Sequence, residues 1–261
     1  GTPGAPSEPT AAGIAGALGA TGGELGDIGL ADWTLDAPHR PRHALDPDQP
    51  GLSELIAASR FGPASPTVAR EATHLTDGGY RLLPGLRRHA DWITVGPEAA
   101  ANALAAVRAT SGLVVVHAEP DLEGERDTGS FDIEDRNALA RTAVSRADLV
   151  VVAGSASQRG DAVAATLARL QAFGTPEARL AVVRPQVVRW TRRRPPADPI
   201  GGPPSLVLHD GPRADQRLGV SLWTLLRAVS ASSPGEPPPE REPEAIAPGT
   251  LGHWLRRWTA G

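Results

Sequence analysis

Short apolar runs alternate with helical patterns along most of the chain. The runs 112–117 and 147–154 are rich in valine, and such β-branched runs indicate strands that are buried on both faces. Helical patterns flank them at 97–111, 133–145 and 160–173. This alternation predicts an α/β fold in three α/β/α layers, with a doubly wound, mostly parallel sheet, helices on both faces and right-handed crossovers.

Weaker patterns complete the predicted domain. We expect further helices over 10–25, 51–61 and 220–229, and further strands over 27–32, 79–85, 180–184 and 205–209. The Pro-rich passage 39–50 predicts a loop. Because the strand over 27–32 ends in Asp32, this carboxylate is expected at the carboxyl edge of the sheet.

The end of the chain has a different composition. Residues 233–250 are rich in Pro and Glu, and a tract that buries so little apolar surface predicts a disordered linker after a domain that spans 1–232. In the last segment, 251–261, four apolar residues have the i, i+3, i+4, i+7 spacing of a short amphipathic helical turn beside two arginines: Leu251, Trp254, Leu255 and Trp258. This segment either packs back onto the domain or makes a weak contact with a partner or a membrane surface.

Composition and charge exclude several classes of function. A formal net charge of -4 and a pI near 6.0 give no overall attraction to nucleic acid or anionic lipid. The chain has no Cys, which excludes disulfides and thiolate metal sites and favours a cytoplasmic location. The apolar runs are far shorter than the roughly 20 residues of a membrane span. The His residues show no spacing typical of zinc ligands.

The first residues, 1–12, have the pattern of a phosphate-binding loop that opens a helix. Candidate nucleotide contacts are Gly4, Ser7 and Thr10. Glu8 and Pro9 stand where such a loop has Lys and Ser or Thr, and no lysine occurs in the chain. A carboxylate repels phosphate, and proline lacks an N–H donor. The pattern predicts a nucleotide-binding fold with eroded chemistry, and the alternative is a flexible Gly/Pro-rich segment. Since the chain lacks Met, we expect the strand that leads into this loop to be missing.

Two motifs carry a family resemblance. The segments Tyr80–Gly85 and Ser130–Arg141, together with the order of elements over 1–229, resemble the MinD/ParA class of deviant P-loop ATPases, and in particular its actinobacterial CpaE-like branch. The resemblance implies ATP or ADP with Mg²⁺ as the cofactor. It also implies a homodimer, or a heterodimer with a paralogue, and a role in positioning a septum, a pilus or secretion machine, or a chromosome.

The departures from this family weaken the case for catalysis. His117 stands where the resemblance implies a strand-end Asp, Val183 stands where it implies an Asn, and Asp32 matches its acidic residue. Glu119 and Asp121 follow His117 and are either solvated carboxylates or ligands that hold Mg²⁺. We therefore expect no catalytic residue, and the identity of any metal ligand stays open.

Three functions follow. The leading prediction is a degenerate MinD/ParA-like protein, a pseudo-ATPase that serves as a non-hydrolysing scaffold or regulatory partner. The first alternative is a slow ATPase in which arginines replace the missing lysines. The second is a nucleic-acid-binding adaptor that uses the cluster Arg189, Trp190, Arg192, Arg193 and Arg194. A solvated basic loop is the plain interpretation of that cluster.

Overall fold

The computed structural model describes residues 7–19, 26–46, 48–153, 160–185, 205–208, 222–227 and 255–260. The strands are β1 (Ile28–Trp33), β2 (His74–Leu75), β3 (Arg81–Leu83), β4 (Leu113–Ala118), β5 (Leu149–Ala153), β6 (Leu180–Pro185), β7 (Ser205–Leu208) and β8 (Leu255–Ala260). The helices are α1 (Ser7–Gly19), α2 (His39–Arg42), α3 (Leu52–Ala58), α4 (Pro66–Glu71), α5 (Pro97–Thr110), α6 (Glu125–Thr128), α7 (Phe131–Arg136), α8 (Ala138–Ser145) and α9 (Gly160–Ala172). Two 3-10 turns, η1 (His89–Thr94) and η2 (Glu177–Arg179), and helical residues 222–227 complete the list.

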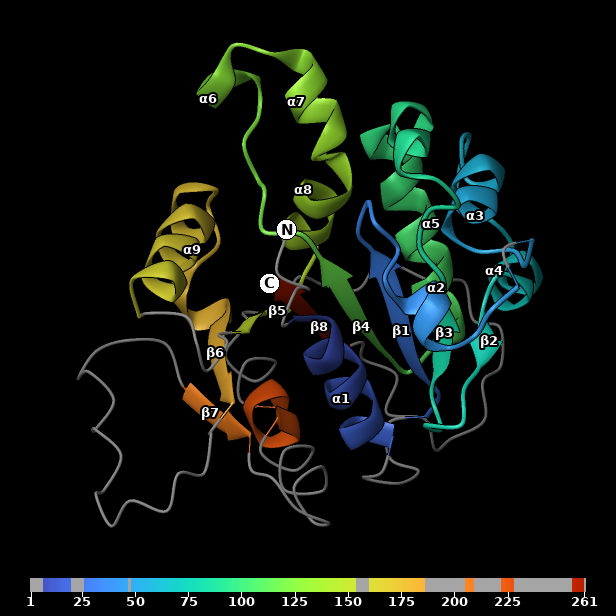
Figure 1. The fold of residues 1–261 in the computed structure, drawn as a ribbon, viewed down its shortest axis with the longest axis horizontal. Helices are drawn as coiled ribbons and strands as arrows, with labels where there is room; N and C mark the ends of the chain where they lie inside the picture. Colours follow the sequence, from blue (N-terminus) through green and yellow to red (C-terminus); the bar gives the residue numbers. More distant parts are fainter. Residues whose placement is uncertain are drawn as a thin grey trace, which may run out of the picture.

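The strands form one sheet in the order β2-β3-β1-β4-β8-β5-β6-β7 (Figure 1). Its pairs are parallel except for β2 and β3, which are antiparallel. β1 and β4 are paired along their whole length, from Ile28 with Leu113 to Trp33 with Ala118. Both strands are fully buried, as expected of central parallel strands.

Helices cover both faces of the sheet (Figure 1). One apolar cluster joins the sheet to α3, α4, α5, α8 and α9, with Leu55, Leu104 and Leu139 among its buried members. The second cluster joins the opposite face to α1 and residues 222–227, through Ile14 and Leu222. The predicted doubly wound α/β fold is therefore confirmed.

Several local predictions needed correction. The helix predicted over 133–145 is divided at Asn137 into α7 and α8, and the passage 39–50 contains α2 in addition to a loop. The first helix begins at Ser7, before the predicted start at 10, and is described as far as Gly19, so its predicted end at 25 lies outside the described residues. The analysis of periodicity missed α4, although its cap was visible: the Ser65 hydroxyl accepts from the Val68 N–H, and Pro66 opens the helix.

The largest correction concerns the end of the chain. Residues 255–260 form strand β8 instead of a helical turn. A helix of that length is marginal in isolation, whereas the strand is paired on both sides, with β4 and β5. Leu251, Trp254 and the tract 233–250 lie outside the described residues. The domain boundaries at 232 and 250 therefore stay predictions.

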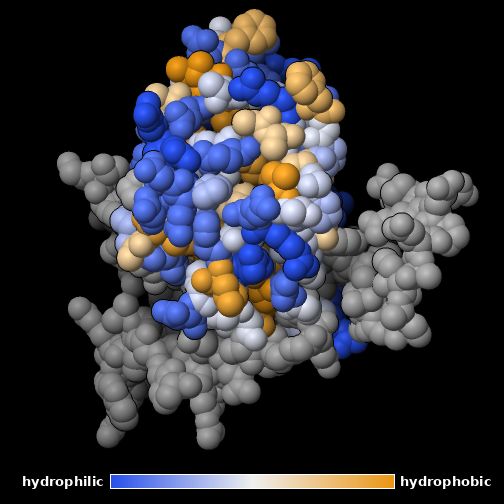
Figure 2. Space-filling model, turned by 90° about the vertical axis from the view of Figure 1, so that its right-hand side faces the viewer, coloured by the Kyte–Doolittle hydropathy of each residue, from blue (hydrophilic) through white to orange (hydrophobic). Residues whose placement is uncertain are grey.

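The side of the molecule that carries α3, α4 and α5 shows hydrophobic side chains scattered among polar ones (Figure 2). Across the described residues, the large exposed hydrophobic side chains are Phe61, Val68, Leu75, Ile93 and Phe131. Scattered exposed apolar residues are ordinary for a protein surface. No helix in the described part of the chain is long and apolar enough to cross a membrane.

Candidate functional site at the carboxyl edge of the sheet

The candidate site begins where β1 and β4 end side by side. Asp32 and His117 are Cα partners in the parallel register. Because all these strands point the same way, their carboxyl ends share one edge, which is where ligands bind in open α/β sheets. The prediction that Asp32 lies at this edge is confirmed.

Asp32 is completely buried and held by its own neighbours. Its Oδ1 accepts hydrogen bonds from the Thr34 hydroxyl at 2.7 Å and from the Thr34 backbone N–H at 3.2 Å. Its Oδ2 accepts from the backbone N–H of His39 at 3.3 Å. These bonds fix the turn that joins β1 to α2, so the carboxylate has a structural task in the described conformation.

His117 takes the place of a strand-end carboxylate and is almost completely buried. Its Nδ1 lies 3.2 Å from Nε2 of His39, so that one ring nitrogen donates a hydrogen bond and the other accepts it. The two rings meet edge to face. Burial lowers the pKa of His117 from 6.5 to about 4, because the charged imidazolium loses its hydration. The imidazole is therefore neutral at pH 7.

The histidine contact extends away from the sheet. The ring of His39 stacks on His43, and Nε2 of His43 lies 3.3 Å from the Tyr80 hydroxyl. Tyr80 belongs to the family-like segment 80–85. This motif therefore contributes to the same row of contacts, which runs from His117 through the two other histidines to the Tyr80 hydroxyl. Together, Asp32, Thr34, His39 and His117 form a buried hydrogen-bonded group, which we call the Asp32–His117 cluster.

The two carboxylates that follow β4 are engaged with protein groups. Glu119 Oε1 accepts a hydrogen bond from the Leu35 N–H at 3.0 Å. Burial raises the pKa of Glu119, while that hydrogen bond opposes the change. Asp121 forms an ion pair with Arg169 at 3.7 Å. In the described part of the chain, no group of three or more His, Cys, Asp or Glu residues is placed to hold a metal ion.

The second family-like motif holds the loop after β4. Asn137 Nδ2 donates to the carbonyl of Glu123 at 2.9 Å, and the Arg141 guanidinium donates to the carbonyl of Leu122 at 2.6 Å. Arg141 also lies over the ring of Phe173. Leu122, Arg141 and Phe173 line a pocket of about 660 Å³ between the α6–α7 arm and α9. Two of the arginines that line it, Arg141 and Arg169, pair with carboxylates, and the bonds from Asn137 and Arg141 to backbone carbonyls make this motif a support for the loop.

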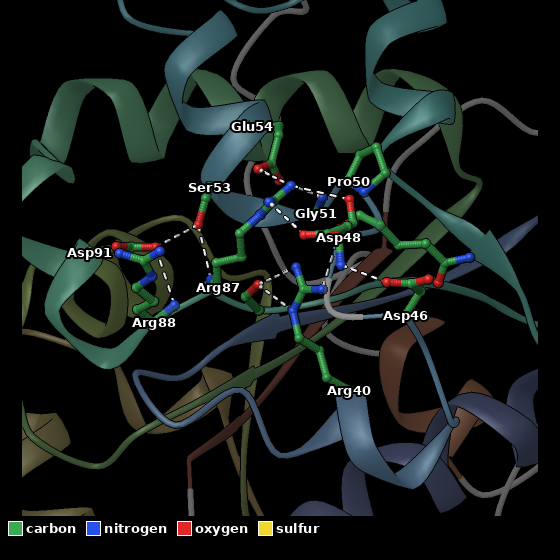
Figure 3. A network of polar contacts seen from close by, with 12 residues as sticks. Arg40, Asp46, Asp48, Pro50, Gly51, Ser53, Glu54, Arg87, Arg88 and Asp91 are labelled. Carbon is green, nitrogen blue, oxygen red and sulfur yellow. Dashed lines mark hydrogen bonds and ion pairs between the residues drawn. The ribbon is translucent and has the colours of Figure 1, made fainter.

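A second polar network holds the loops after α2 and β3, which lie beside this edge of the sheet (Figure 3). The buried Arg40 guanidinium donates to the carbonyl of Gly85, from Nε at 3.3 Å and from NH2 at 3.2 Å, and to the carbonyl of Gln49. Arg87 pairs with Glu54 at 2.9 Å and with Asp48 at 3.5 Å. The donors of Arg40 are thus directed at backbone carbonyls of the loops after α2 and β3.

Gly85 packs so closely against Ala37 and Asp32 that we predict a loss of stability for any side chain at this position. A Cβ at Gly85 would lie 2.8 Å from the Ala37 Cβ and 3.0 Å from the Asp32 Cγ. Since neither neighbour is the end of a flexible side chain, Gly85→Ala should lower the free energy of unfolding by about 1–3 kcal/mol in urea titrations. Gly13→Ala in α1 is the matched control, because nothing lies within 4 Å of its added Cβ. An equal effect of both substitutions would contradict the prediction.

The other predicted contact residues lie on α1 and β8 or outside the described residues. Ser7 and Thr10 lie in the first turn of α1, and Leu255 and Trp258 lie in β8. The remaining ones are outside the described residues: Gly4, Arg189, Trp190, Arg192, Arg193, Arg194, Leu251 and Trp254. The sequence analysis missed His39, Thr34 and Arg40. Thr34, two positions after Asp32, has a spacing at which side chains bond to a neighbouring backbone, but His39 sat in a predicted loop.

Comparison with known proteins shows which solved structures have a similar fold. No protein-family model matches the sequence, and no curated protein matches it significantly. A plasmid partition protein from Borrelia burgdorferi superposes with a TM-score of 0.56 at 11% identity, over 87% of this chain and 95% of its own. A ParA family ATPase from Chlorobium tepidum TLS superposes with a TM-score of 0.53 at 15% identity, over 85% of this chain and 87% of its own.

A third solved structure is less similar. The cobyrinic acid a,c-diamide synthase from Mycobacterium smegmatis, with bound ATP analog and magnesium, has a TM-score of 0.49 at 17% identity, over 86% of this chain and 79% of its own. The first two neighbours share the ParA-like, P-loop NTPase fold, and at such identities they show the fold alone. Membership of the deviant MinD/ParA class and of its CpaE-like branch stays a prediction.

Proposed function

We propose that this protein is a non-hydrolysing scaffold or regulatory partner built on a P-loop NTPase-like fold. The observation that supports the proposal most is the Asp32–His117 cluster, which fills the carboxyl edge of β1 and β4 with buried side chains bonded to one another. In this arrangement the carboxylate accepts hydrogen bonds from protein groups, and one ring nitrogen of each histidine contacts the other histidine. They are poorly disposed to bind Mg²⁺ or to activate water.

Charge supports the same conclusion. Phosphoryl transfer depends on cations that neutralise the negative charge developing on the transferred group. The chain contains no lysine, His117 is neutral at pH 7 because its pKa is about 4, and the Arg40 guanidinium is bonded to backbone carbonyls. A slow ATPase would need another arginine at the site, together with Glu119 or Asp121 on Mg²⁺.

The cellular role is proposed from the neighbours that share the fold. One of them is a plasmid partition protein and another a ParA family ATPase, so we propose a task in spatial positioning, whether of a septum, a pilus or secretion machine, or a chromosome. The partner would be a second copy of the chain or a paralogue. Sedimentation velocity at high micromolar concentration should detect the homodimer. A monomer with and without nucleotide, and with a paralogue added, would contradict this part.

Nucleotide calorimetry tests the central claim. We expect no heat of binding from ATP or ADP at millimolar concentration with Mg²⁺, and no phosphate release above that of buffer, because the Arg40 guanidinium is directed at backbone carbonyls and the Asp32 carboxylate accepts hydrogen bonds from protein groups. Micromolar binding that Asp32→Asn weakens and Glu98→Gln leaves unchanged would overturn the proposal and support the slow ATPase. Glu98 is a suitable control because it is exposed on the first turn of α5.

A further inference from the structure

The α6–α7 arm, residues 121–136, projects beyond the carboxyl ends of β1 and β4 (Figure 1). No residue of α6 or α7 is buried, whereas α8, which follows directly, has six buried residues among its eight. The turn η1, which contacts α7, has no buried residue either. These short elements therefore contribute little to the apolar core, and much of their surface faces the solvent.

Two large hydrophobic side chains are exposed on these elements. Phe131, the first residue of α7, is 68% exposed, and Ile93 of η1 is 72% exposed. Because α7 and η1 contact each other, both residues lie in the same part of the surface. At the upper end of the molecule in Figure 2, hydrophobic side chains stand among strongly hydrophilic ones. Exposed apolar groups rimmed by polar residues mark interaction sites. We call Phe131, Ile93 and the charged residues of the arm the arm surface.

The arm is strongly acidic. It holds seven Asp and Glu residues and two Arg, a formal charge of -5 in a chain whose net charge is -4. Arg169 of α9 pairs with Asp121 and Glu123. Arg141 of α8 pairs with Glu134. With both of these arginines counted, an excess of three negative charges remains. A surface with an excess of one charge attracts partners of the opposite charge and speeds their association.

Three carboxylates of the arm are available to a partner. Glu125, Asp132 and Asp135 are exposed, and their side chains form no hydrogen bond or ion pair with another described residue. In a helix, residues three or four positions apart lie on the same side. Asp135 therefore shares one side of α7 with both Asp132 and Phe131. This places two unpaired negative charges beside an exposed aromatic ring.

Hydrogen bonds hold these elements in place without apolar burial. Glu134 Oε2 accepts a hydrogen bond from the Glu125 N–H at 2.8 Å, which ties α7 to α6. At the start of η1, Asp91 Oδ2 accepts from the Arg88 N–H at 3.1 Å. A surface that is fixed before binding loses less conformational entropy when a partner docks. The arm surface is thus ordered in the absence of any partner.

We propose that the arm surface docks a basic amphipathic segment of a partner protein, which packs an apolar residue against Phe131 and Ile93 and places Lys or Arg beside Asp132 and Asp135. Such a segment covers the exposed apolar groups and neutralises the excess charge. Nucleic acid and anionic membranes are disfavoured because they carry the same charge as the arm. The inference goes beyond the proposed function and holds whether or not nucleotide is hydrolysed, since no residue of the arm surface belongs to the Asp32–His117 cluster.

Fluorescence anisotropy with the full chain tests the choice of partner. The probe is a fluorescein-labelled synthetic peptide of Leu and Lys in amphipathic helical spacing, and its control has Glu in place of every Lys. The Lys peptide should bind saturably, and its affinity should fall as salt is raised, because salt screens exposed charges. The Glu peptide should not bind. No saturable binding of the Lys peptide, or equal binding of the two peptides, would overturn the proposal.

Matched variants test the location of the binding surface. Phe131→Ser with Asp132→Asn should weaken binding of the Lys peptide by about tenfold or more. Leu75→Ser with Asp77→Asn is the control, because Leu75 is 73% exposed and Asp77 is exposed, but the stretch 70–81 around them has no net charge. All four positions are exposed, so both variants should keep the circular dichroism spectrum and urea midpoint of the parent.

Two outcomes of this comparison would overturn the proposal. Equal weakening by both variants would indicate a nonspecific attraction of the basic peptide to the whole chain. Loss of self-association by the Phe131→Ser, Asp132→Asn variant in sedimentation velocity, with peptide binding unchanged, would identify the occupant as a second copy of the chain. Nucleotide calorimetry on the same variant should match the parent, so failure of this inference is distinguishable from failure of the proposed function.

Discussion

Asp32→Ala should lower the free energy of unfolding by about 3–5 kcal/mol. The substitution removes the acceptor of three hydrogen bonds, from the Thr34 hydroxyl, the Thr34 N–H and the His39 N–H. Because Asp32 is completely buried, water cannot replace the lost acceptor, and each abandoned donor costs about 1–3 kcal/mol. Urea unfolding followed by circular dichroism gives the value.

The comparison with Asp32→Asn separates a structural carboxylate from a ligand-binding one. The amide oxygen of Asn keeps the acceptor for Thr34, but its NH₂ group faces the His39 N–H, so we expect a smaller loss than for Ala. A carboxylate reserved for a metal or phosphate site commonly lowers stability in the absence of its ligand, and its removal then stabilises the protein. A gain in stability for both variants would contradict the structural role assigned here.

The fold could be predicted from the sequence because each strand and helix is indicated by a pattern within a short stretch of residues. The valine runs at 114–116 and 150–152 determine strands that are buried on both faces, and the flanking Ala-rich segments determine the helices. The order of these elements then leaves few arrangements for the sheet. The strand-end position of Asp32 followed from the same reasoning.

The contacts that define the site depend on residues far apart in the chain. His39 and His117 are 78 positions apart, and nothing near His39 in the sequence indicates that its passage folds back over β4. Strand β8 shows the same limit. The residues 251–258 have helical spacing, and only their pairing with β4 and β5 turns residues 255–260 into a strand. Tertiary pairing overrides local preference in short segments of this kind.

The buried histidine should also make stability depend on pH. The pKa of His117 is about 4 in the folded protein and 6.5 when exposed, a gap that corresponds to roughly 3 kcal/mol. Between these values the unfolded chain binds a proton that the folded protein does not. The contribution is therefore fully present above pH 6.5 and is lost as the pH falls toward 4.

Other buried groups act in the opposite direction. Burial raises the pKa of Asp148 from 3.8 to about 6, so between these values the folded protein binds more protons than the unfolded chain, and stability falls as the pH rises. Glu119, whose pKa is also raised by burial, acts in the same sense. The profile of the unsubstituted protein is consequently expected to be shallow, and only a comparison of variants isolates His117.

His117→Asn provides that comparison, since the Asn side chain can keep the polar contact with His39 but does not titrate. At pH 7 the variant should be less stable than the parent, because it loses the packing of the ring. That deficit should shrink by about 3 kcal/mol as the pH is lowered from 7 to 4. Asp148→Asn should show the converse, with a steeper gain in stability between pH 4 and 6.5 than the parent. Urea titrations across this range measure both, and a His117→Asn deficit that is independent of pH would contradict the burial of a neutral imidazole at the edge of β4.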